Sequence, residues 1–144
     1  MISVNIQYIK DLSFENPNAP KSISNQEKPP EINVDVNVSA KPLNKNIFEV
    51  SLSLSAKAKN DKFVVFEAEL IYCGVFTIPD NVDESATQKL VLIEGPKLLF
   101  PFARSILADI TRDGGFLPLI IQPIDFNALF ENRLKVETST KGSA

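Results

Sequence analysis

Apolar and polar residues alternate with a period of two through the first half of the chain. The clearest case is residues 32–38, where isoleucine and valine alternate with asparagine and aspartate. In the same way, Ile2, Val4, Ile6 and Tyr8 fall on one face of a predicted strand. This pattern is typical of strands with one buried face. We predict four strands, over residues 2–14, 32–38, 48–58 and 63–76.

Turn residues indicate how these strands connect. Residues 59–62 (KNDK) predict a tight hairpin between the third and fourth strands, and residues 41–46 predict a turn between the second and third. Two proline clusters, in 17–20 and 29–30, predict an irregular crossover between the first and second strands. We therefore expect a four-stranded antiparallel sheet, a meander with a crossover, that has one face in water.

The second half of the chain changes to a helical period. Residues 83–93 predict a short helix that begins at an Asp83 N-cap and is interrupted by Gly95-Pro96. Residues 98–112 carry apolar side chains three and four positions apart, which predicts an amphipathic helix. Pro101 should kink this helix or mark its start, and Gly114-Gly115 should end it.

An apolar loop over residues 116–124 precedes a last helix capped by Asp125. Its aliphatic residues Leu119, Ile120, Ile121 and Ile124 cannot all turn inward from an irregular segment, so we expect some of them to meet a partner or substrate. Strands followed by helices indicate an α+β fold, in which two main α-helices pack on the sheet. We expect one domain over residues 1–137 and a disordered tail over residues 138–144. The first strand is long and apolar, so as a sheet edge it should pair with a second copy in a two-fold dimer.

Composition limits the chemistry that the chain can perform. It has no histidine, and its five glycines form no phosphate-binding motif. We expect no catalytic residue, no metal and no cofactor, and the net charge of −3 argues against a nucleic-acid partner. Glu67 and Glu69 share a strand face, which leaves a carboxylate hydrolase as an alternative to a hydrated sheet face.

The sequence also bears on location. Cys73 is the only cysteine, so it forms no intrachain disulfide, which fits a reducing compartment. No apolar run approaches the roughly 18 residues of a membrane span, and residues 1–8 lack the pattern of a signal peptide. We expect a cytoplasmic protein without direct membrane insertion.

Three segments carry a resemblance to a known family. They are DLSFENPNAP (11–20), GP (95–96) with LLFPFAR (98–104), and GF (115–116), Pro118 and QPIDFNALF (122–130). EI (31–32) and CGVF (73–76) fall in place between them. Over residues 5–134 the chain resembles the SecB family of protein-export chaperones.

The resemblance implies a function and an assembly. SecB-like proteins are homotetramers, built as dimers of dimers. They bind unfolded preproteins in the cytoplasm, keep them competent for translocation and deliver them to the SecA ATPase. They need no ATP or metal of their own. The alternative is a small non-enzymatic binding or adaptor domain of the same fold with a different client.

The resemblance also assigns residues to two surfaces. It implies that Asp11, Glu15 and Glu69 contact SecA. Without the resemblance, the same three residues indicate only a solvated charged face. Apolar positions that could line a substrate groove are Phe14, Val34, Val36, Leu119, Ile121 and Ile124, with core packing as the other reading. Lys28 stands where many relatives have tryptophan, which puts one aromatic wall of that groove in doubt.

Candidate contacts between copies come from three elements. The apolar first strand contributes Ile6 and Tyr8. The fourth strand contributes Phe66, Ala68 and Leu70, where the family shows positions that affect the balance of dimer and tetramer. The amphipathic helix contributes Phe102 and Ile106. Packing within one subunit is an equal alternative for the three residues of the fourth strand.

Overall fold

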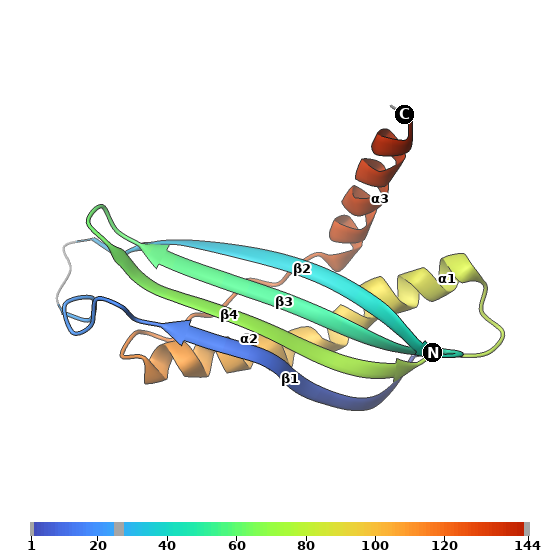
Figure 1. Cartoon of the computed structure of the whole chain (residues 1–144), viewed down its shortest axis with the longest axis horizontal. Helices are drawn as coiled ribbons and strands as arrows, with labels where there is room; N and C mark the ends of the chain where they lie inside the picture. Colours follow the sequence, from blue (N-terminus) through green and yellow to red (C-terminus); the bar gives the residue numbers. More distant parts are fainter. Residues whose placement is uncertain (1, 25–27, 143–144) are drawn as a thin grey trace.

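The computed structural model describes residues 2–24 and 28–142. Four strands come first: β1 (Ser3–Glu15), β2 (Glu31–Asn44), β3 (Ile47–Lys59) and β4 (Val64–Thr77). The helical half follows: α1 (Glu84–Lys89), the π-helix η1 (Leu90–Glu94), α2 (Gly95–Asp113) and α3 (Phe126–Gly142). The predicted α+β fold is confirmed: α2 lies along one face of the sheet, and α3 extends away from it past β2 (Figure 1).

The sheet has the strand order β1-β4-β3-β2, and every neighbouring pair is antiparallel. Strands β2, β3 and β4 form the predicted meander. The segment between β1 and β2 therefore crosses the end of the sheet from one edge to the other. Asn18 fastens this crossover, because its Nδ2 donates a 2.8 Å hydrogen bond to the carbonyl oxygen of Val64 at the start of β4.

The register divides the sheet into a face covered by helices and an open face. Leu12, Leu70, Leu54 and Val36 are paired across the four strands and lie on the helix-covered face. The residues directly before and after these four in each strand point to the opposite, open face of the sheet. Between Val4 and Ile6 a register shift inserts an extra residue into β1. The single face predicted for Ile2, Val4, Ile6 and Tyr8 is therefore wrong.

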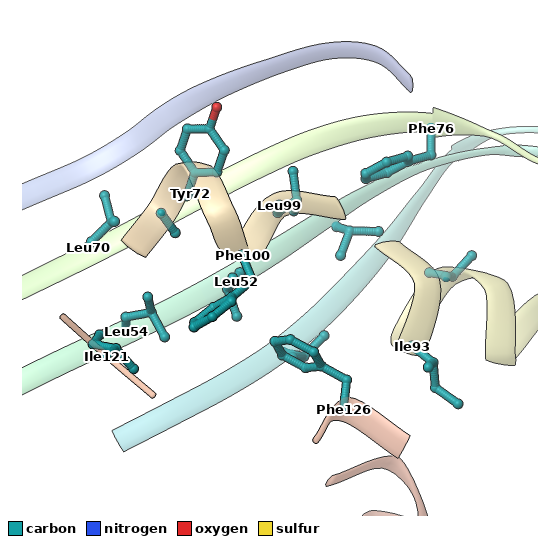
Figure 2. Packing of buried hydrophobic residues seen from close by; sticks show 14 of the residues in the cluster. Leu52, Leu54, Leu70, Tyr72, Phe76, Ile93, Leu99, Phe100, Ile121 and Phe126 are labelled. Carbon is teal, nitrogen blue, oxygen red and sulfur yellow. The ribbon is translucent and has the colours of Figure 1, made fainter. Parts of the chain in front are cut away.

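The core lies between the sheet and the helices. Leu52, Leu54, Leu70 and Phe76 meet Leu99 and Phe100 of α2, Ile93 of η1 and Phe126 of α3 (Figure 2). Gly74 lets α2 approach β4 closely, because a Cβ at that position would lie 2.9 Å from Leu99. Side chains from both halves of the chain thus form one hydrophobic core.

The helix boundaries agree only in part with the predictions. Asp83 caps α1, accepting a 2.7 Å hydrogen bond from the backbone nitrogen of Ala86, as expected. Gly95-Pro96 does not interrupt the helical run, because η1 leads into α2 at Gly95. The backbone nitrogen of Gly95 donates to the carbonyl oxygen of Leu90, five residues earlier, so the hydrogen bonds have π-helical spacing just before Pro96. Pro101 lies inside α2, so a helix start beside it is also wrong.

The end of α2 and the start of α3 follow the sequence signals. α2 ends at Asp113, and Gly114 and the positive-φ Gly115 follow it, as predicted. Asp125 accepts a 3.0 Å hydrogen bond from the backbone nitrogen of Ala128 and so caps α3. The backbone of residues 138–142 continues α3 where we predicted a disordered tail, and residues 143–144 lie outside the described residues.

Within the described part of the chain, we find no helix with both the length and the apolar character that crossing a bilayer requires.

Candidate functional site

Three phenylalanines cluster at the end of the sheet where β1 finishes and β4 begins. Phe14, Phe66 and Phe116 come from β1, β4 and the loop after α2, and their ring centroids lie 5.0 to 6.4 Å apart. Gly114 makes room for this cluster, because a Cβ there would lie within 2.6 Å of two Phe14 ring atoms. The cluster therefore holds the loop that follows α2 against the sheet.

Exposed apolar side chains surround this aromatic cluster. The loop after α2 presents Leu117, whose surface is 90% exposed, and Ile120, which is 60% exposed. The crossover segment and the start of β2 add other exposed aliphatic side chains. Together they form what we call the apolar rim: Ile23, Ile32, Val34, Leu117 and Ile120.

Packing and strand pairing place the members of the apolar rim near one another. A Cβ on Gly115, next to the loop, would lie 2.9 Å from Ile23. Ile32 and Val34 pair with Ala58 and Ala56 of β3, and these alanines belong to the same cluster as Phe116 and Leu119. This end of the molecule therefore offers apolar surface from three segments that are distant in the sequence.

The predicted groove residues divide between this surface and the interior. Val34 is exposed on the apolar rim, Phe14 is half-buried in the aromatic cluster, and Val36 is half-buried against the core. In the loop, Leu119 and Ile124 are half-buried, whereas Ile121 is buried and points toward the core (Figure 2). A groove role for these residues stays a prediction.

Sequence reasoning named only Val34 of the apolar rim as an individual groove residue, although Leu117 and Ile120 lie in the apolar loop that it gave as a candidate. The apolar loop did carry a signal, because its consecutive aliphatic residues cannot all turn inward. That signal did not tell which ones turn outward. Ile23 had no signal at all, because its exposure depends on how the crossover folds.

The three predicted acidic contacts share the open face of the sheet. Asp11 and Glu15 of β1 and Glu69 of β4 are exposed, and the register pairs Glu69 with Ser13, between the two β1 acids. A shallow hollow of about 250 Å³ runs across this face, and its lining includes Asp11, Glu69 and Asp35 of β2. Asp35 was missed, although the alternation in residues 32–38 already placed it on the polar side.

Glu67 lies on the same face but has a basic partner. Its carboxylate is 3.2 Å from the Nζ of Lys57 on β3. Glu69 pairs across the strands with Ser13 and Ser55, so the two glutamates lie on an open face rather than in an enclosed cleft. This geometry favours the hydrated sheet face over the carboxylate hydrolase.

An ionic clamp ties the edge strand β1 to β3 across the open face. The Tyr8 hydroxyl donates a hydrogen bond to Glu49, and Lys10 Nζ lies 3.1 Å from the same carboxylate. Burial, reinforced by the hydrogen bond to Glu49, raises the pKa of Tyr8 to about 12. Hydrogen bonds from Tyr8 and Lys10 lower the pKa of Glu49. Burial raises the pKa of the Cys73 thiol, which lies opposite Tyr8 on β4.

Replacing Glu49 with glutamine should remove a pH-dependent part of the stability. The pKa of Glu49 is lower in the folded chain than its ordinary value of 4.5, so its carboxylate stabilises the fold above that pH. This contribution is lost as the pH falls through the lowered pKa. We expect Glu49→Gln to cost about 1 kcal/mol near pH 7 and progressively less below about pH 4. Urea unfolding across that range measures it, and a pH-independent difference would contradict the clamp.

The predicted contacts between copies differ in exposure. Ile6 of β1 is exposed on the open face, and Phe102 is exposed on α2, where its ring stacks on that of Tyr72 with the centroids 6.4 Å apart. Ile106 is half-buried. In the described subunit Phe66, Ala68 and Leu70 are buried, which fits the alternative of packing within one subunit, and their role between copies stays a prediction.

The family model described as preprotein translocase subunit SecB matches residues 1–137. The chain belongs to the SecB family. The protein-export protein SecB of Bartonella bacilliformis is 49% identical over 141 residues, which cover 98% of this chain and 88% of that protein. Its namesake from Methylocella silvestris is 50% identical over 133 residues, which cover 92% and 82% of the two chains.

A solved structure shows the same fold. The SecB-like chaperone of Mycobacterium tuberculosis, solved in complex with a peptide from an antitoxin, superimposes with a TM-score of 0.70. The match covers 85% of this chain and 90% of that one at 15% identity. The family membership confirms the resemblance seen in the sequence and makes this SecB-family chain a protein-export chaperone.

Proposed function

We propose that the apolar rim holds unfolded preproteins in the cytoplasm and keeps them competent for translocation. The observation that carries this proposal is the exposure of Leu117 and Ile120 beside an aromatic cluster. An unfolded polypeptide exposes apolar side chains that a folded protein buries, and contact with the rim removes both surfaces from water. Holding of this kind requires neither nucleotide hydrolysis nor a covalent step.

The edge strand β2 supports the same role. It lies at the end of the sheet order, and its first apolar residues, Ile32 and Val34, are exposed on the helix-covered face. An extended polypeptide can add to a strand edge through backbone hydrogen bonds that do not depend on its sequence. Backbone pairing and adaptable aliphatic contacts together suit a binder with many clients.

Mixing the purified protein with a reduced, unfolded preprotein tests the proposal. The proposal expects slower aggregation of the preprotein, without added nucleotide. Unslowed aggregation together with absent SecA binding would favour an adaptor domain with a different client. Turnover of a substrate that disappears in Glu67→Gln or Glu69→Gln would instead favour the hydrolase.

The acidic open face is our proposed contact with SecA. Asp11, Glu15 and Glu69 are exposed there, together with Asp35, so a basic segment of the partner would find several carboxylates on one side of the sheet. Clients on the apolar rim and SecA on the open face would then occupy opposite sides of the same sheet. Client holding and delivery could proceed at once.

Replacing Glu69 with lysine should weaken SecA binding about tenfold, because a like charge then meets the basic partner. Its side chain is exposed, so the free energy of unfolding should change by less than about 0.5 kcal/mol. Titration of SecA at two salt concentrations measures the loss. Asp61→Lys, an equal charge change on the exposed β3–β4 hairpin, is the matched control. Equal affinities of the two variants would remove Glu69 from the contact.

We further propose that four copies assemble as a dimer of dimers. β1 is a sheet edge that exposes Val4, Ile6, Ile9 and Leu12, and a second copy could extend the sheet there. α2 presents Leu98 and Phe102 for contact between dimers. Several rims that engage one polypeptide would raise the avidity above that of a single weak contact.

Replacing Phe102 with aspartate should convert tetramers into dimers. The side chain is 51% exposed in one subunit, so burial of a new charge would oppose assembly more than folding. Light scattering at several concentrations should give the mass of four 15.9 kDa chains for the unsubstituted protein and about half that mass for the variant. A concentration-independent monomer in the unsubstituted protein would contradict the assembly.

A further inference from the structure

Thr111 is a fully buried polar residue in the last turn of α2. Its hydroxyl donates to the carbonyl oxygen of Leu107 at 2.8 Å, one helical turn earlier. The same oxygen accepts a 2.9 Å hydrogen bond from the backbone nitrogen of Leu119, in the loop after α2. The hydroxyl also lies 3.1 Å from the carbonyl oxygen of Ala108, so its one hydrogen points back along the helix and a lone pair remains to accept from the loop.

Thr111 holds a second point of the same loop through its backbone. Its carbonyl oxygen accepts a 3.1 Å hydrogen bond from the backbone nitrogen of Phe116. Phe116 and Leu119 both pack against the cluster that contains Phe66. Thr111 therefore holds both ends of residues 116–119, and the side chains at those two ends, Phe116 and Leu119, face the interior.

Fastening both ends determines what the middle of the segment does. Leu117 lies between the two fixed points and is 90% exposed, although a free loop could turn such a side chain inward. With Phe116 and Leu119 packed inward and both bonded to Thr111, the two hydrogen bonds favour the conformation in which Leu117 faces outward.

We propose that Thr111 is a positioning residue that displays Leu117 to apolar side chains of an unfolded client. The inference rests on the proposed client role of the apolar rim and adds the device that presents it. A loop fixed in its binding conformation loses less conformational entropy when a client binds. Thr111 itself is buried and contacts no client.

Thr111→Val tests this device, because valine matches threonine in shape but cannot accept the Leu119 bond. We expect its affinity for reduced, carboxymethylated α-lactalbumin to fall roughly threefold to tenfold. Amide exchange at Leu119 should become faster. Thr111→Ser keeps the hydroxyl and should restore both properties. Thr111→Ala serves as the second variant should valine crowd the site and unfold the chain.

A double-mutant cycle with Leu117→Ser separates positioning from general stability. If Thr111 acts by displaying Leu117, the loss in Thr111→Val should largely disappear when Leu117 is already serine. Unchanged client affinity in Thr111→Val, or fully additive losses, would overturn the inference and leave the client role intact. Absence of client binding by the unsubstituted protein would overturn the proposed function itself.

Discussion

Replacing Leu117 and Ile120 together with serine will weaken the binding of an unfolded preprotein by about tenfold to a hundredfold. Burial of one aliphatic side chain contributes about 1.5–3 kcal/mol, and each of these two should be partly buried by the client. Neither contributes much to the core, since they are 90% and 60% exposed. The free energy of unfolding should therefore stay within about 0.5 kcal/mol of the unsubstituted value. Equilibrium titration and urea unfolding measure the two quantities.

Leu43→Ser supplies the matched control for the double variant. Leu43 is also an exposed aliphatic residue, 45% exposed, but it lies near the far end of β2, away from the apolar rim. Its loss should leave client affinity within about twofold of the unsubstituted protein. If Leu43→Ser and the double variant weaken binding equally, clients bind nonspecifically to any apolar surface and the rim has no special role.

Replacing Phe66 with alanine will lower the free energy of unfolding by about 3–5 kcal/mol. Its side chain is 3% exposed and packs against Phe14 and Phe116, so the substitution leaves a cavity between β1, β4 and the loop after α2. Aromatic pairs add to the loss beyond the buried area. Urea unfolding must be compared at one protomer concentration, because assembly contributes to apparent stability.

Comparison with Phe102 distinguishes a role of Phe66 in the core from a role at a contact between copies. Phe102 is exposed on α2, so Phe102→Ala should cost the single subunit less than about 1 kcal/mol. Phe66→Ala should therefore be the less stable variant by a wide margin. A Phe66→Ala protein of unchanged stability but altered mass in light scattering would place Phe66 at a subunit contact instead of in the core.

The strands were predictable because apolar and polar side chains alternate along most of their length. The same alternation placed Asp11 and Glu15 on one face, and the register confirms that they lie together. Near the start of β1 the prediction fails, since the register shift between Val4 and Ile6 depends on how β1 pairs with β4. β1 and β4 are about 70 positions apart in the sequence, so the local alternation of apolar and polar residues in β1 does not show how the two strands pair.

The helical half shows a different limit. Gly95-Pro96 looks like an interruption because both residues weaken a helix interior, yet the π-helix η1 leads directly into α2 there. In the apolar loop, the sequence indicated that some aliphatic residues face outward but not which. Thr111 fixes that choice through contacts with Phe116 and Leu119, and a threonine on a helix gives no sign of such a role.

Amide hydrogen exchange of the chaperone, with and without saturating unfolded preprotein, tests the central claim most directly. The claim is that clients bind where the apolar rim and the start of β2 meet. Bound preprotein should therefore slow exchange in residues 32–36 and 117–121 and leave the β2–β3 turn at residues 44–47 unchanged. Binding without protection in those two segments, or protection confined to the β2–β3 turn, would contradict the account.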